Sequence, residues 1–388
     1  MRFWSVLAMA TLGCGGGTPA TPDAPNDGFD RNAMLAHLVD SVLLPIQADL
    51  ATQTTALTAA IETYCDQLDA GGGTPDAARE AWRTTMVAVD RFDAAVVGPA
   101  AMDNRAQRDR VYGWPLLSTC FVDRDTATLF TSGQLDVTAK LANAKSLTAV
   151  EYLLFNTSAN FTCVNEPPGW SSMTASDLAK TRCRHAAAIA ADVAAAAAEL
   201  DTAWRADGGN FVAELSHAGQ SDSSIPTAQE GVNRVSDGMF FVDRMVKDMK
   251  LAEPAGIAIN ACGTVGEPCL IEVEHPFADT TSFAVRTNLR TLRELFTGKT
   301  ATADGLGFDD FLIGLGHEDV ATRMIASLDA AIASADALPD SFLGALDTEL
   351  PKIQATHAAV TVFTDDLKSQ FLTLLSLEIP DDVAADND

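Results

Sequence analysis

The sequence predicts an all-α protein made of two helical-bundle domains packed side by side. Three observations favour helices: the 388-residue chain is rich in alanine, only 7% of its residues are aromatic, and apolar residues recur at helical spacing almost throughout. Strand-like alternation is nearly absent. A chain of this length can hold two domains, and a polar, Gly/Ser-rich stretch over residues 205–225 marks the expected boundary.

Apolar spacing predicts the helices of the first half. Apolar residues from Leu35 to Ile61 follow helical spacing, with an interruption expected at Pro45 because its ring cannot continue the hydrogen-bond ladder. The next helix should stop before Gly98, and Ser176 is expected to cap the long alanine-rich helix. The further helices predicted in this half cover residues 77–95, 141–155 and 176–204.

The second half shows the same helical pattern. Pro226 suits the first turn of one helix, Gly298 suits the end of another, and Pro351 interrupts the last one. The expected bundles therefore span residues 29–205 and 206–388. The helices predicted in the second half cover residues 226–251, 282–296, 308–315, 319–333 and 341–377.

The N-terminus has the pattern of an export signal. Arg2 supplies a positive charge, a short apolar stretch follows, and Gly13-Cys14 resembles the cleavage point of a lipoprotein. We therefore expect a signal peptide over residues 1–13, a lipidated Cys14 and a flexible tether over residues 14–28. The alternative is a periplasmic protein in which Cys14 is incidental. The expected location is the outer membrane, through the lipid anchor, or the periplasm.

The charge of the chain excludes two classes of partner. Its formal net charge is -27 at pH 7 and no basic stripe is present, so binding to nucleic acid or directly to anionic lipid is disfavoured. Contact with a membrane is expected only through the lipid anchor, because no later run approaches membrane-spanning length. The partners that remain are envelope uptake or surface proteins, and the chain itself is expected to be a monomer.

Besides Cys14 the chain has six cysteines, and an even number in an exported protein favours disulfides. A zinc site is disfavoured because no CxxC pair exists. Six cysteines allow about 15 pairings. The predicted pairs are Cys262–Cys269, which closes a short loop, Cys163–Cys183 and, by elimination, Cys65–Cys120.

Several segments together resemble one family, the imelysins, which were once described as insulin-cleaving envelope metallopeptidases. The resemblance covers nearly all of the chain after the export signal, and it implies a helical fold and an envelope location. The segments that carry it include Val42-Leu43-Leu44-Pro45, Ala81-Trp82-Arg83, Gly98-Pro99, Gly113-Trp114-Pro115 and Asn288-Leu289.

The imelysin hallmark is Gly-x-His-x-x-Glu ahead of an apolar run, and this sequence keeps only the glutamate. The corresponding residues are Ser146, Thr148 and Glu151. A histidine three residues before a glutamate shares its helix face and can hold a metal with it. Threonine offers only a neutral hydroxyl, which is a poor ligand for zinc or ferrous iron. The hallmark is therefore degenerate in this chain.

Glu151 is the central candidate for a site. It is the only carboxylate in the apolar segment 146–155, so burial of its neighbours draws it toward a low-dielectric region where it needs a partner. One interpretation is a ligand-binding or metal-binding residue, with Thr148 and Ser146 beside it. The alternative is a structural ion pair with an arginine. The arginines considered for that pair are Arg91, Arg105 and Arg110.

Two further acids are candidates. Asp93 stands where the resemblance implies a glutamate that lines the site, and its alternative is a solvated acid. Glu274 precedes a helix whose dipole favours a carboxylate at its N-terminus. In the other interpretation Glu274 binds a ligand, and His275 replaces the missing histidine. His185 is expected on a helix surface.

We predict a non-catalytic envelope protein that binds a ligand or cation between the two bundles. The cofactors considered are a divalent metal or iron, and the family resemblance implies a link to iron uptake as in some relatives. The alternative function is a metallopeptidase of the imelysin type. Catalytic zinc normally needs three protein ligands, usually with histidine among them, and this chain has no helical histidine pair. No residue is therefore assigned a catalytic role.

Overall fold

The structure, a computed structural model, describes residues 27–378. All regular elements in this range are helical, which confirms the predicted all-α class. The π-helical segments are η1 (Val39–Leu43), η6 (Val242–Ala252) and η8 (Leu367–Phe371). The α-helices are α1 (Arg31–Leu38), α2 (Leu44–Asp69), α3 (Asp76–Asp93), α4 (Ala106–Val111), α5 (Thr119–Ser132), α6 (Leu147–Phe155), α7 (Ala175–Trp204), α8 (Phe211–Ser216), α9 (Ala228–Met239), α10 (Thr281–Thr297), α11 (Phe308–Gly314), α12 (Glu318–Asp336), α13 (Phe342–Thr348), α14 (Leu350–Asp366) and α15 (Leu372–Leu375).

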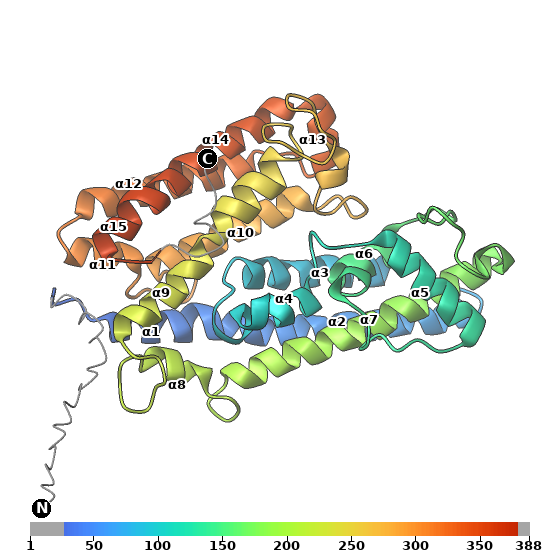
Figure 1. Cartoon of the computed structure of the whole chain (residues 1–388), viewed down its shortest axis with the longest axis horizontal. Coiled ribbons are helices and arrows are strands. Elements are labelled where there is room, and N and C mark those ends of the chain that lie inside the picture. Colours follow the sequence, from blue (N-terminus) through green and yellow to red (C-terminus); the bar gives the residue numbers. More distant parts are fainter. Residues whose placement is uncertain (1–26, 379–388) are drawn as a thin grey trace, which may run out of the picture.

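The helices form two groups (Figure 1). Helices α1 to α8 lie together, α10 to α15 form the second group, and α9 leads from one to the other. In the first group α2 packs against α3 and α7, and in the second α12 packs against α10 and α14. Helices α3 and α10 contact each other across the groups, and buried apolar residues of both form one continuous cluster. The division into domains at residues 205–206 stays a prediction.

Pro45 does not interrupt the first helical rod, contrary to the sequence prediction. Elements α1, η1 and α2 follow one another without a break, and Pro45 lies in the first turn of α2. The π-helical turn over Val39–Leu43 accommodates the proline, because the wider turn relieves the clash of the ring with a preceding carbonyl.

Among the described residues one helix, Arg31–Asp69, is long and apolar enough to cross a membrane. Half of its apolar window is buried inside the protein, as in a core helix.

Several predicted helix ends agree with the structure to within a few residues. Helix α10 ends at Gly298, which adopts a φ of 62° as expected for a glycine that closes a helix. The residue that caps α7 is Thr174, two residues before the predicted Ser176, and it forms a reciprocal capping box with Asp177. The segment predicted as a helix from residue 141 contains a short 3-10 helix over Ala142–Ala144, and α6 covers only its second part, from Leu147.

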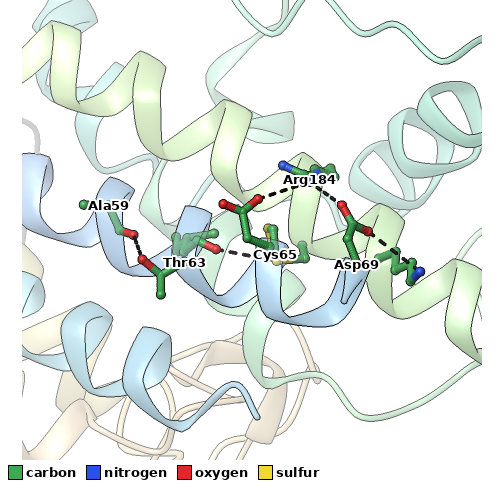
Figure 2. The surroundings of a disulfide bond; sticks show 9 residues. Ala59, Thr63, Cys65, Asp69 and Arg184 are labelled. Atoms are coloured by element: carbon green, nitrogen blue, oxygen red, sulfur yellow. Dashed lines mark hydrogen bonds and ion pairs between the residues drawn. A yellow bond between two sulfur atoms is a disulfide. The ribbon is translucent and has the colours of Figure 1, made fainter. Parts of the chain in front are cut away.

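The disulfides correct part of the sequence prediction. Cys262–Cys269 is confirmed, but the pairs Cys163–Cys183 and Cys65–Cys120 are wrong. The cause is the packing of α2 beside α7, which brings two cysteines of different helices into contact. Figure 2 shows Cys65 on α2 at this interface, close to the ion pair between Arg184 and Asp69. The observed pairs are Cys65–Cys183, Cys120–Cys163 and Cys262–Cys269.

Some predictions fall on the N-terminal residues. The signal peptide over residues 1–13, the lipidated Cys14 and most of the tether over residues 14–28 lie outside the described residues. The described chain begins with Asp27, whose carboxylate accepts hydrogen bonds from the guanidinium of Arg31 at the start of α1.

Candidate functional site

Helix α6 begins at a strained residue. Ser146 precedes the helix with φ 85° and ψ 175°, a backbone conformation that is essentially restricted to glycine. Its buried hydroxyl accepts a hydrogen bond from the Gly113 N–H at 3.0 Å and lies 2.9 Å from the Thr148 hydroxyl. Ser146 and Thr148 therefore bond to each other and to the Gly113 turn. This arrangement fixes the first turn of α6.

Glu151 is buried one turn further along α6, with 1% of its surface exposed. Its Oε1 atom accepts hydrogen bonds from the backbone N–H groups of Phe277 at 3.0 Å and Ala278 at 2.9 Å. Its Oε2 atom lies 3.2 Å from Nδ1 of His275. Glu151 thus finds its partners in the loop before α10, as a charged group in a low-dielectric region requires.

The arginine pairing considered for Glu151 is absent for two of the three arginines. Arg91 pairs with Glu294 at 2.8 Å. Arg110 pairs with Asp192 at 2.9 Å. Both arginines thus have carboxylate partners elsewhere.

His275 is fully buried and held from several sides. Its Nε2 atom lies 3.4 Å from the Tyr112 hydroxyl and 3.9 Å from Oε2 of Glu274, and its ring lies edge-on to Trp82. Burial lowers the pKa of His275, but the carboxylates of Glu274 and Glu151 outweigh this effect and raise it above the ordinary value. In the neutral ring, the carboxylate of Glu151 holds the proton on Nδ1. Nε2 then carries the lone pair, between the Tyr112 hydroxyl and Oε2 of Glu274.

Glu274 lies at the centre of a polar cluster. Its Oε1 atom accepts hydrogen bonds from the Tyr112 hydroxyl at 2.6 Å and from Nζ of Lys250 at 2.7 Å. Lys250 is fully buried and also donates to Asn288 at 2.8 Å. The Oε2 atom of Glu274 is buried and has no hydrogen-bond partner among the described residues. One oxygen of this carboxylate is therefore satisfied and the other is not.

Asp90 contributes a second unsatisfied carboxylate oxygen. It lies on α3 with 1% exposure, and its Oδ1 atom is buried with no hydrogen-bond partner among the described residues. Burial raises the pKa of Asp90 to about 7, because the opposing effect of Lys250 is incomplete and Glu274 adds to the rise. One ligand atom each of Asp90, Glu274 and His275 lies within 4.8 Å of the others. These three residues form what we call the acid–histidine cluster.

The net charge of this region depends on whether Asp90 and His275 carry protons. With protons on Asp90 and His275, the positive charges of His275 and Lys250 offset the negative charges of Glu151 and Glu274. Without these protons, three carboxylates face the single charge of Lys250, which leaves two negative charges uncompensated. A divalent cation would compensate both charges in the buried site.

Asp93 is brought near this region but not into the cluster. It is 1% exposed, which excludes the solvated alternative, and Arg108 holds both of its oxygens through Nε at 2.6 Å and Nη2 at 2.8 Å. Arg108 also donates to the carbonyl of Trp114 at 2.9 Å. Asp93 therefore anchors the turn that follows α4. Of the acidic sequence candidates, the structure joins Glu151 and Glu274 through His275 and leaves Asp93 apart.

Sequence reasoning missed Asp90 and Lys250. Asp90 lies four residues after Met86 and eight after Trp82, so it continues their apolar stripe, and a carboxylate on such a stripe was a usable signal. Lys250 lies in the π-helix η6, whose wider turn departs from the 3.6-residue period that sequence analysis assumes.

The prediction for His185 was wrong. It is 1% exposed, and its Nδ1 atom lies 2.9 Å from the Thr126 hydroxyl. The residue faces α5 and not solvent, because α5 packs on this part of α7.

Comparisons with known proteins agree with this architecture. The family model described as Imelysin matches residues 43–371. A search among curated proteins finds no match. The crystal structure of an imelysin-like protein from Psychrobacter arcticum 273-4 is similar with a TM-score of 0.66 and 15% identity, over 90% of this chain and 96% of that one.

A second crystal structure has the same fold. It is that of a protein described as an iron-regulated protein A precursor from Parabacteroides distasonis ATCC 8503, with a TM-score of 0.67 and 19% identity. The similarity covers 92% of this chain and 96% of that one. At these identities the two structures establish the fold, and the family model covers most of the sequence. The chain therefore belongs to the imelysin family.

Proposed function

We propose that this protein is a non-catalytic envelope protein that binds a divalent cation, with iron as the first choice, at the acid–histidine cluster. The observation that carries the proposal is that Asp90, Glu274 and His275, all buried, bring one ligand atom each within 4.8 Å of the others. Two carboxylate oxygens of this set, Oδ1 of Asp90 and Oε2 of Glu274, are of special interest. Both oxygens lack hydrogen-bond partners among the described residues, and buried carboxylate oxygens normally have one. A cation would supply the missing interaction for both.

The donor set fits a first-row metal ion. Imidazole nitrogen combined with carboxylate oxygen suits iron, manganese and zinc. Ligand atoms at about 2.1 Å from a metal are at most about 4.2 Å apart, so the cluster needs only a small contraction from its 4.8 Å limit. Glu151 would act through His275, because a carboxylate on Nδ1 orients the ring and directs the Nε2 lone pair to the metal.

Burial favours binding over peptidase chemistry. A catalytic zinc site keeps an open coordination position that substrate and water can reach. Here Glu274 is 2% exposed, Asp90 is 1% exposed and His275 is fully buried. The metallopeptidase alternative is therefore the less favoured function.

The envelope location and the link to iron rest on resemblance. The N-terminal sequence has the pattern of an export signal, and three disulfides suit an oxidising compartment. One structural neighbour is described as an iron-regulated protein precursor, which supports iron as the first cation to test. A lipid anchor at Cys14 belongs to the same proposal, and the mass of the mature N-terminus would reveal it.

Metal titration tests the proposal directly. The oxidised protein is treated with a chelator and titrated anaerobically with Fe²⁺, and in parallel with Mn²⁺ and Zn²⁺, by calorimetry. We expect one ion per chain, and at least a tenfold loss of affinity in Glu274→Gln and His275→Gln. The control is Glu294→Gln, a half-buried acid on α10 that pairs with Arg91 outside the cluster. Failure to bind any of the three ions, or chelator-sensitive cleavage of an unfolded protein substrate, would overturn the proposal.

A further inference from the structure

A second pocket lies away from the acid–histidine cluster. It has a volume of about 320 Å³ and is formed where the end of α6 meets α2, α3 and α7. Aliphatic side chains supply much of its wall, including Leu153, Leu154 and Leu178. Its volume falls at the lower end of the range for small-molecule sites.

The lining of this pocket carries positive charge only. Among the described residues that line it are Arg79 and Arg182, and none of the lining residues is an aspartate or glutamate. The pocket also adjoins the N-terminal ends of α3, at Pro75, and of α7, at Ala175, whose dipoles favour an anion. In a chain with a formal charge of -27 such a lining is unusual, and it favours an anionic ligand.

Arg182 is the key residue of the pocket. It is 6% exposed, and its Nη1 atom donates to the carbonyls of Asn156 at 3.0 Å and Ser158 at 2.8 Å. Its Nε and Nη2 atoms are buried and have no hydrogen-bond partner among the described residues. Burial lowers the pKa of Arg182, and Tyr152 and Asp123 offset this effect only in part. Apart from the electrostatic interaction with Tyr152, two nitrogens of this buried guanidinium therefore have no hydrogen-bond acceptor among the described residues.

The Nε–Nη2 edge of a guanidinium is suited to binding a carboxylate. Nε and Nη2 of an arginine together hold a carboxylate in a bidentate manner. This protein shows the arrangement in Arg108, which uses these two nitrogens to hold Asp93. Arg79 differs, because its Nε donates to the carbonyl of Leu154 at 2.9 Å and so closes the end of α6.

We propose that this pocket binds a small organic carboxylate, whose anionic group pairs with the Nε–Nη2 edge of Arg182 and whose apolar body lies against the leucines. Both nitrogens are shielded from water, so the side chain must turn toward the bound anion. Arg79 adds a second positive charge at the site. The proposal is independent of the cation site, because the two sites share no residue.

A purely structural arginine is the competing explanation. Arg182 already closes the end of α6 through two carbonyls, and its guanidinium lies 5.8 Å from the ring centroids of Tyr152 and Trp170. A structural role predicts that replacing Arg182 lowers stability and changes no ligand affinity. The carboxylate proposal predicts a saturable ligand whose affinity depends on this residue.

Calorimetry and thermal unfolding with three probes separate the two explanations. The full-length oxidised protein is titrated with hexanoate, benzoate and inorganic phosphate. We expect saturable binding of at least one carboxylate, a rise in Tm with its concentration, and no saturable binding of phosphate. The affinity should fall at least tenfold in Arg182→Lys, because lysine cannot form the bidentate pair.

Two further variants keep the test decisive. Ala179→Trp places a bulky ring in the pocket wall from α7 and should abolish carboxylate binding even if Arg182→Lys folds poorly. Arg184→Gln is the control, because Arg184 lies two residues further on α7 and pairs outside the pocket with Asp69 (Figure 2). Binding of phosphate alone, binding of no probe, or carboxylate binding that survives both pocket variants would overturn the proposal.

Discussion

The Nδ1 atom of His275 lies 3.2 Å from the Oε2 atom of Glu151, and each side chain is 1% exposed. The contact joins α6 to the loop before α10 across 124 residues of sequence. The motif that the sequence resembles would place a histidine at the position of Thr148, on the same helix as the glutamate. In this chain an imidazole reaches the glutamate from another segment instead. The position of His275 therefore depends on tertiary packing.

Glu151→Gln should weaken metal binding without removing a proposed ligand. The amide oxygen can still accept from Phe277 and Ala278, but the NH₂ group then faces Nδ1 of His275 and forces the ring proton onto Nε2. A protonated Nε2 cannot bind a metal, so we expect about a 10–100-fold loss of affinity. Calorimetric titration measures the loss, and NMR of the imidazole nitrogens reports the change of tautomer.

The control for this variant is Glu199→Gln. Its carboxylate is 54% exposed and pairs with Arg110 away from the cluster, so the affinity for metal should stay unchanged. Unchanged affinity in Glu151→Gln as well would show that Glu151 does not orient the proposed ligand.

Ser146 should respond differently to glycine and to alanine. Both variants lose the hydroxyl that accepts a hydrogen bond from the Gly113 N–H and contacts Thr148. Only glycine also relieves the strain of the backbone at φ 85°. A residue other than glycine in this region costs about 1–3 kcal/mol. We therefore expect Ser146→Gly to be more stable than Ser146→Ala by about that amount in urea unfolding. Equal or greater stability of the alanine variant would contradict this account of the strain.

The helices could be predicted because their signals are local. Apolar spacing identified α3 and α10, and Gly298 ends α10 where the sequence indicates. The prediction failed at Pro45, where a π-helical turn accommodates a ring that an α-helix would not. Such a turn has no short sequence signature, so the continuous rod from α1 to α2 required the structure.

The site could be predicted only in part, because its members come from several elements. Glu151 was identifiable as a single acid in an apolar stretch, and Glu274 with His275 as an acid and imidazole before a helix. That these residues meet depends on how α10 packs against α3. Lys250 was hidden for a different reason, since the π-helix η6 shifts the period on which the sequence reading relied.

The disulfide that closes a long loop should stabilise the protein more than the one that closes a short loop. Cys65–Cys183 closes a loop with a sequence separation of 118, and Cys262–Cys269 closes one of 7. By loop-closure entropy the first should contribute about 5 kcal/mol and the second about 2 kcal/mol. Double serine variants of each pair, compared by denaturant unfolding, measure the difference. Equal losses would contradict the entropic account, and peptide mapping under non-reducing conditions checks the pairing itself.

His185 should make stability depend on pH. Burial, with a smaller effect of Lys140, lowers the pKa of His185 to about 3 from an ordinary value near 6.5. The unfolded state therefore binds more protons than the folded state between these values. The free energy of unfolding should be fully maintained above about pH 6.5 and fall by up to about 1.4 kcal/mol for each pH unit below it.

The variant His185→Gln isolates this contribution from that of the many carboxylates. It should be less stable than the wild type at pH 7, because the ring packing on Thr126 is lost, yet lose less stability on acidification to pH 4. The control is His317→Gln, at a half-exposed position before α12. Its free energy of unfolding should fall with pH as steeply as that of the wild type. The expected difference follows from burial, since an imidazole that cannot be hydrated resists protonation until the fold opens. If the free energy of unfolding fell equally steeply with pH in the wild type and in His185→Gln, the His185 ring would be protonated within the folded protein.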